Sequence, residues 1–231
     1  MQTKMIEFAA SGEITEHGTA PGYLARPDGN APGVVVIQEW WGLNDHVRDV
    51  ANRFAAAGFA ALAPDLYRGQ VATEPDEARK LAMALQFPQA LVDIQGAADY
   101  LLTQPFVQPK KVGVIGFCMG GRLAGLTAVN GRNIGAVVSF YGVSELSDED
   151  VAKITTPLLA IYGETDQGYS PDMIRENERR LAAAGKAHET IVYPGAPHAF
   201  FNDTRPHIYQ KQTADTAWEK TLAWFRQYLA E

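Results

Sequence analysis

Three side chains suited to nucleophilic catalysis each follow an apolar segment of the chain. Cys118 follows residues 111–116, Asp166 follows residues 158–162, and His198 follows residues 190–193. In acyl transfer an imidazole takes the proton of a nucleophile, while a carboxylate orients the imidazole and supports its charged form. The order of the three residues therefore predicts a Cys–His–Asp triad.

Glycines frame the cysteine in the pattern Gly116-x-Cys118-x-Gly120. This is the spacing of a nucleophile elbow, a tight strand-to-helix turn in which flanking side chains would collide. At the start of the following helix, backbone N–H groups favour a thiolate and later an oxyanion. The N–H of Met119 is the first candidate oxyanion donor.

Each of these residues also has a plainer interpretation. A lone cysteine is often a small buried hydrophobic residue, and Asp166 could simply belong to a turn. His198 could be a loop histidine, although its position directly after an apolar run favours catalysis. The other histidines are interpreted as ordinary surface residues: His17, His46, His188 and His207.

Two rival sites do not fit the sequence. A dinucleotide-binding loop needs Gly-x-Gly-x-x-Gly, a spacing that Gly113, Gly116 and Gly120 do not make, and the apolar residues 136–140 supply no acidic partner. No serine lies in a Gly-x-Ser-x-Gly frame. Cys118 is therefore the only candidate for an elbow nucleophile.

Composition and charge narrow the class of protein. Of 231 residues, 46% are hydrophobic and 20% are charged, which is typical of a folded globular chain, here expected to form one domain over residues 1–231. The net charge of −7 disfavours nucleic acid and anionic membranes as partners. A single cysteine excludes an intramolecular disulfide and a multi-cysteine metal site, and we expect neither a metal nor a cofactor. Without a signal-peptide core or a bilayer-spanning apolar segment, a cytoplasmic location is expected.

Apolar runs alternate with segments of helical spacing along the chain. Strands are expected over residues 33–37, 59–63, 111–116, 136–140, 158–162 and 190–193. Helices are expected over residues 46–57, 75–86, 88–103, 119–129, 171–184 and 213–229. This alternation predicts an α/β fold whose mostly parallel sheet has helices on both faces, with residues 5–8 and 22–26 as an antiparallel edge. Sites in such folds collect at the carboxyl ends of the strands.

The chain resembles the dienelactone hydrolase family of α/β-hydrolases over nearly its whole length. The resemblance rests on Gln38-Glu39-Trp40-Trp41-Gly42, Pro64-Asp65-Leu66-Tyr67, Gly116-Phe117-Cys118-Met119-Gly120-Gly121, Tyr141-Gly142, Gly163-Glu164-Thr165-Asp166 and Gly195-Ala196-Pro197-His198. It implies an α/β-hydrolase fold and hydrolysis of lactones or small esters through a covalent thioester. About 17 residues separate residues 140 and 158, too few for a cap domain.

The resemblance also gives roles to residues around the triad. Glu39 would hold the resting thiol, and the N–H of Trp40 would be the second oxyanion donor. From the residues alone, a carboxylate after an apolar strand could equally be a solvated loop charge. Candidate substrate-binding residues are Trp40, Trp41, Tyr67, Arg79, Tyr141, Phe200 and Arg205.

Two departures concern substrate charge. Enzymes of the family bind a substrate carboxylate with two arginines, of which Arg79 roughly matches one. The second position, four residues after His198, is Asn202, and the nearest arginine is Arg205. A neutral aromatic ester is therefore at least as plausible a substrate as a charged dienelactone.

Two further functions remain open at this stage. The same cysteine could make the protein a promiscuous aryl esterase and phosphotriesterase that needs no metal. Alternatively, the chain could be a non-catalytic redox or ligand-binding module in which Cys118 oxidises reversibly. Its expected partners are a small-molecule substrate and, at most, a second copy in a weak homodimer.

Overall fold

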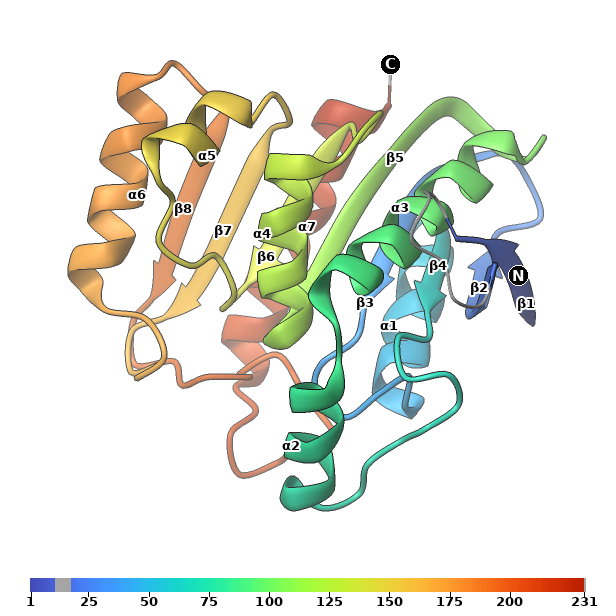
Figure 1. Ribbon diagram of the computed structural model, residues 1–231, viewed down its shortest axis with the longest axis horizontal. Helices are drawn as coiled ribbons and strands as arrows, with labels where there is room; N and C mark the ends of the chain where they lie inside the picture. Colours follow the sequence, from blue (N-terminus) through green and yellow to red (C-terminus); the bar gives the residue numbers. More distant parts are fainter. Residues whose placement is uncertain (11–17, 231) are drawn as a thin grey trace.

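A continuous sheet runs through the computed structural model, which describes residues 1–10 and 18–230 (Figure 1). Its strands lie in the order β1-β2-β4-β3-β5-β6-β7-β8. Their bounds are β1 Gln2–Ala9, β2 Thr19–Arg26, β3 Ala31–Ile37, β4 Ala60–Pro64, β5 Val107–Phe117, β6 Ala136–Phe140, β7 Leu158–Gly163 and β8 His188–Tyr193. The pairings of β1 with β2 and of β2 with β4 are antiparallel, and the others are parallel. The predicted antiparallel edge is confirmed.

Helices cover both faces of the sheet, as the alternating pattern predicts. Their bounds are α1 Asp45–Ala56, α2 Pro75–Ala84, α3 Phe87–Thr103, α4 Met119–Asn130, α5 Asp148–Lys153, α6 Pro171–Ala183 and α7 Lys211–Leu229. The parallel strands end at the lower edge in Figure 1, where α2 and the loop after β8 also lie. Among the described residues, no helix combines the length and apolar character needed to cross a membrane.

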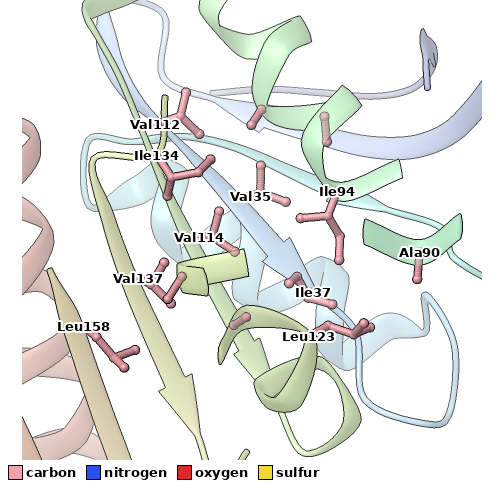
Figure 2. Packing of buried hydrophobic residues seen from close by; sticks show 14 of the residues in the cluster. Val35, Ile37, Ala90, Ile94, Val112, Val114, Leu123, Ile134, Val137 and Leu158 are labelled. Atoms are coloured by element: carbon pink, nitrogen blue, oxygen red, sulfur yellow. The ribbon is translucent and has the colours of Figure 1, made fainter. Parts of the chain in front are cut away.

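The central strand β3 shows why the core has two halves. Alternate side chains of a strand point to opposite faces, so Val35 and Ile37 pack on one side and Val34 and Val36 on the other. Figure 2 shows the first pair among side chains of α3 and α4, while α1 and α7 cover the opposite face. Because both faces are buried, the strand is continuously apolar.

The sequence missed α5 and misplaced several boundaries. The strand expected over residues 111–116 extends over Val107–Phe117, and the last strand begins at His188. The helix α5 has a local signal, since Ser147 accepts a hydrogen bond from the Asp150 N–H and the Asp150 carboxylate accepts one from the Ser147 N–H. Such a capping box could have revealed the helix.

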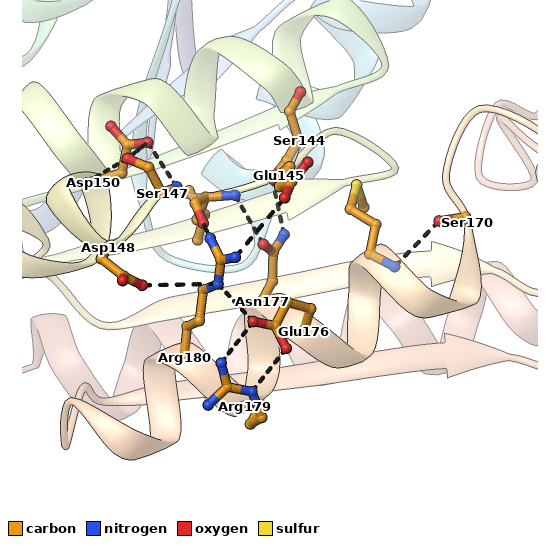
Figure 3. Close-up of polar contacts among 12 residues, drawn as sticks. Ser144, Glu145, Ser147, Asp148, Asp150, Ser170, Glu176, Asn177, Arg179 and Arg180 are labelled. Carbon is orange, nitrogen blue, oxygen red and sulfur yellow. Dashed lines mark hydrogen bonds and ion pairs between the residues drawn. The ribbon is translucent and has the colours of Figure 1, made fainter.

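The connection from β6 to β7 is short and is held against the flank of the sheet. Asn177 of α6 accepts a hydrogen bond from the Leu146 N–H at 2.9 Å and donates one to the Ser144 carbonyl at 2.8 Å. Arg180 donates to the Leu146 carbonyl from the same helix (Figure 3). The connection therefore contributes α5 but no cap domain, as expected.

Candidate active site

Cys118 lies in the turn between β5 and α4 with a strained backbone. Its φ is 56° and its ψ is −116°, a conformation rarely adopted by residues other than glycine. Its N–H donates to the Phe140 carbonyl at 3.1 Å, which anchors the turn to β6. A Cβ atom on Gly116 would lie 1.9 Å from the Gly120 carbonyl oxygen, so the first glycine of the frame is required by packing.

Replacing Gly116 with alanine is expected to lower the free energy of unfolding by about 3 kcal/mol, because the backbone of Gly120 must move. Urea denaturation followed by circular dichroism measures the change. Gly125→Ala is the matched control, since a Cβ there would lie 3.4 Å from the nearest atom, a side-chain carbon of Val143. A similar loss in both variants would contradict this account of the turn.

His198 and Asp166 form a tight pair at the carboxyl edge of the sheet. The Nδ1 atom of His198 lies 2.7 Å from Oδ2 of Asp166, whose other oxygen accepts a hydrogen bond from the Gly168 N–H at 2.8 Å. The His198 side chain lines the same pocket as Cys118, and the two groups are close enough for Cys118 to raise the pKa of His198. Beneath it, the ring of Tyr141 lies 4.8 Å from the imidazole, centroid to centroid. Three residues distant in sequence are thus brought together in the order Asp, His, Cys.

The surroundings of His198 favour its protonated form. Burial opposes the charge, but the hydrogen bonds with Asp166 and Cys118 and their negative charges outweigh it and raise the pKa of His198 to about 10. The imidazolium therefore predominates at neutral pH.

Glu39 follows β3 and is held by a residue that the sequence analysis did not assign to the site. The carboxylate is buried and accepts a hydrogen bond from Nδ2 of Asn202 at 2.6 Å. The Oδ1 atom of Asn202 accepts hydrogen bonds from the N–H and hydroxyl of Thr204, which fixes the orientation of the amide. Asn202 thus supplies a neutral donor to Glu39.

Asn202→Ala is expected to lower the free energy of unfolding by about 2 kcal/mol, because the buried Glu39 carboxylate loses a hydrogen-bond donor. Asn202→Asp should cost more, since it places a second carboxylate beside the first. Thermal and urea unfolding measure both variants. A stability of Asn202→Asp equal to that of the wild-type protein would rule out this role of Asn202.

A pocket of about 270 Å³ opens directly onto Cys118. It is lined by Glu39, Trp40, Trp41, Cys118, His198, Ala199 and Arg205. The two tryptophan rings meet edge to face at 5.1 Å, and the guanidinium carbon of Arg205 lies 5.5 Å from the centroid of the Trp41 ring. Three of the predicted substrate-binding residues therefore share a pocket with the cysteine.

The other four candidates do not line this pocket. Phe200 is fully buried and packs against Tyr141, which itself lies under His198, so both belong to the core beneath the site. Arg79 is largely exposed on α2, pairs with Asp76 and does not line the pocket. Tyr67 is buried behind Met119, with its hydroxyl 3.4 Å from the Met119 sulfur.

The predicted oxyanion donors belong to residues near Cys118. Met119 is the first residue of α4, where a backbone N–H has no intrahelical partner. Trp40 lines the pocket beside Glu39. No group of three or more His, Cys, Asp or Glu side chains within residues 1–10 and 18–230 is arranged to hold a metal ion.

An antiparallel edge beside a parallel sheet, with a tight strand-to-helix turn at Cys118 after β5, is the architecture of an α/β-hydrolase. Residues 20–229 match the dienelactone hydrolase family. "Protein usf" of Aquifex pyrophilus is 36% identical, covering 98% of this chain and 99% of that protein. A "putative carboxymethylenebutenolidase" of Aquifex aeolicus is 32% identical over the same shares. The chain belongs to the dienelactone hydrolase family.

Solved structures agree with this assignment. A crystal structure of a "putative dienelactone hydrolase" from Klebsiella pneumoniae has a TM-score of 0.84 and 31% identity, covering 99% of this chain and all of that chain. The metagenomic protein P91, titled a dienelactone hydrolase-like promiscuous phosphotriesterase, also has a TM-score of 0.84, with 24% identity and 98% of each chain covered. The second likeness concerns the fold alone. This chain is a hydrolase of the dienelactone hydrolase type.

Proposed function

We propose that this protein hydrolyses lactones or small carboxylic esters through a covalent thioester on Cys118. The observation that carries the proposal is the hydrogen-bonded pair of Asp166 and His198 in one pocket with a cysteine on a strained elbow. The family supports hydrolysis, and the arrangement of the three side chains supports the triad.

Acylation begins with attack of the Cys118 thiolate on the substrate carbonyl carbon. The carbonyl π electrons move to oxygen, and the resulting oxyanion accepts hydrogen bonds from the N–H groups of Met119 and Trp40. When the oxyanion collapses, the C–O bond to the leaving group breaks. His198 gives its proton to that oxygen and becomes neutral, leaving a thioester.

Deacylation uses the neutral imidazole as a base. His198 takes a proton from water while the water oxygen attacks the thioester carbonyl. Collapse of the second oxyanion breaks the C–S bond, which releases the acid and restores the thiolate beside an imidazolium. Asp166 holds the ring throughout by accepting a hydrogen bond from Nδ1.

The pocket favours a flat substrate with at most one carboxylate. Two tryptophans offer apolar, planar contacts, and Arg205 is the arginine that lines the pocket. The two positions that correspond to the family's carboxylate-binding arginines supply no positive charge to the pocket. Asn202 donates its hydrogen bond to Glu39, and Arg79 does not line the pocket. Relatives named carboxymethylenebutenolidase support a lactone among the substrates.

Rates on three substrates test the proposal: an aryl acetate, a carboxylated enol lactone and an aryl phosphotriester. Arg205→Gln is expected to lower kcat/KM for the carboxylated lactone about tenfold more than for the aryl acetate, because it removes a charged partner of the carboxylate. Steady-state kinetics in metal-free buffer measure both. Equal losses in kcat/KM on the aryl acetate and on the carboxylated lactone would show that Arg205 does not bind the carboxylate.

The two other functions are outcomes of the same assay. Turnover of the phosphotriester would show a phosphotriesterase activity in addition to ester hydrolysis. The same oxyanion donors would serve both reactions, because attack at phosphorus also places negative charge on an oxygen. Failure to hydrolyse any activated ester would favour a binding or redox module. Size-exclusion chromatography with light scattering would test the expected monomer or weak homodimer.

A further inference from the structure

A second, larger cavity lies beside the loop that follows β4. Its volume is about 640 Å³, within the range of small-molecule sites, and it is formed by residues 66–70, by α2 and by the start of α3. We propose that this cavity, called here the acyl pocket, receives a neutral, apolar acyl arm of the substrate. The inference rests on the ester hydrolysis proposed above.

One tyrosine connects the acyl pocket with the nucleophile. Tyr67 lines the cavity, and its hydroxyl lies 3.4 Å from the sulfur of Met119, the residue directly after Cys118. The preceding residue, Leu66, donates its N–H to the side-chain oxygen of Gln38 at 3.1 Å, which ties this loop to the residue before Glu39. The contact between Tyr67 and Met119 therefore connects the lining of the acyl pocket to the residue that follows Cys118. Methionine is unbranched and adapts its shape readily, so its side chain can give way to a ligand.

The chemistry of the lining selects a neutral ligand. Its apolar residues are Leu66, Leu81, Ala84, Leu85, Pro88 and Ala90. Its charged side chains neutralise each other, since Arg68 lies 2.8 Å from the buried carboxylate of Asp93, which also accepts a hydrogen bond from Gln89. A carboxylate on the ligand would have to compete with Asp93 for Arg68, whereas an alkyl or aryl group gains from burial against the leucines.

The direction of proton transfer indicates which arm of the substrate enters the acyl pocket. His198 protonates the leaving oxygen, so the leaving group must lie on the side of the catalytic pocket that His198 and Arg205 line. The acyl carbon is bonded to the Cys118 sulfur, and its chain must extend away from that side. The acyl pocket adjoins Met119 through Tyr67, and we assign the acyl chain to it.

Ala84→Trp tests the proposal by filling the acyl pocket from the exposed end of α2. For the nitrophenyl octanoate ester, kcat/KM is expected to fall at least tenfold, whereas for the acetate ester it should change less than twofold. Met83→Trp is the matched control, because Met83 is the preceding residue of α2 and is 78% exposed. It should leave both rates unchanged.

The outcomes separate this inference from the proposed function. If Ala84→Trp lowers kcat/KM equally on octanoate and acetate, or leaves it unchanged on octanoate, the acyl pocket is overturned. Acetate hydrolysis that depends on Cys118 would still support the proposed function in either case. A binding measurement does not depend on turnover: octanamide should bind to the Cys118→Ala variant in calorimetry and should lose that binding when Ala84→Trp is added. Unchanged binding in the double variant would also overturn the inference.

Discussion

Cys118→Ala is expected to lower kcat/KM on aryl esters and lactones by at least about 10³-fold, equivalent to about 4 kcal/mol of transition-state stabilisation. The loss is large because the alanine variant cannot form a thioester, and any residual rate must come from oxyanion stabilisation and binding. Steady-state kinetics without added metal measure the effect. The fold should remain, because alanine is smaller than cysteine and adds no atom to the strained turn.

The comparison with Cys118→Ser strengthens this test. A hydroxyl keeps the size and position of the thiol but is a poorer nucleophile at neutral pH, so this variant should also be strongly impaired. Circular dichroism must show that both variants are folded. Retention of most of the wild-type activity by the alanine variant would refute a covalent mechanism at Cys118.

Asp166→Asn is expected to have the second largest effect, a loss in kcat/KM of about 10²-fold or more. Burial favours the neutral form of His198, and the hydrogen bond that His198 donates to Asp166 is the largest interaction that opposes it. Without that carboxylate the pKa of His198 falls, the imidazolium is depleted and the ring is no longer held with Nδ1 as the donor. The pH profile of kcat/KM should therefore lose activity at a lower alkaline pH than in the wild-type protein, whose limit lies near the His198 pKa of about 10.

The same residue gives the pH dependence of stability a definite sign. The pKa of His198 in the folded protein, about 10, lies above its ordinary value of 6.5. Its contribution to stability is thus fully present below pH 6.5 and disappears as the pH rises through about 10. Urea denaturation over this range should show a steeper decline for the wild-type protein than for Asp166→Asn. Parallel curves would contradict the assigned cause of the shift.

The sequence predicts the elements and the triad because both depend on local patterns. The apolar run at residues 33–37 and the glycine frame around Cys118 are local signals that survive without knowledge of the partner strands. In a parallel sheet the carboxyl ends meet at the same edge, so three separate strand ends were enough to place Cys118, Asp166 and His198 together.

The environment of the triad depends on tertiary contacts that the sequence does not reveal. Phe200 follows His198 by two residues, and its aromatic ring would suit either a pocket or a core. In the structure Ala199 has a φ of 61° between them, His198 is partly exposed, and Phe200 is buried under Tyr141. The hydrogen bond from Asn202 to Glu39 joins residues 163 positions apart.

Trapping the acyl-enzyme tests the central claim most directly. The protein is mixed with excess aryl ester, quenched in acid during steady-state turnover, digested and examined by mass spectrometry. The account predicts that the peptide containing Cys118 carries one acyl group, because hydrolysis of the thioester by water is expected to be slower than its formation. An unmodified Cys118 during rapid turnover, or an acyl group on another residue, would contradict it.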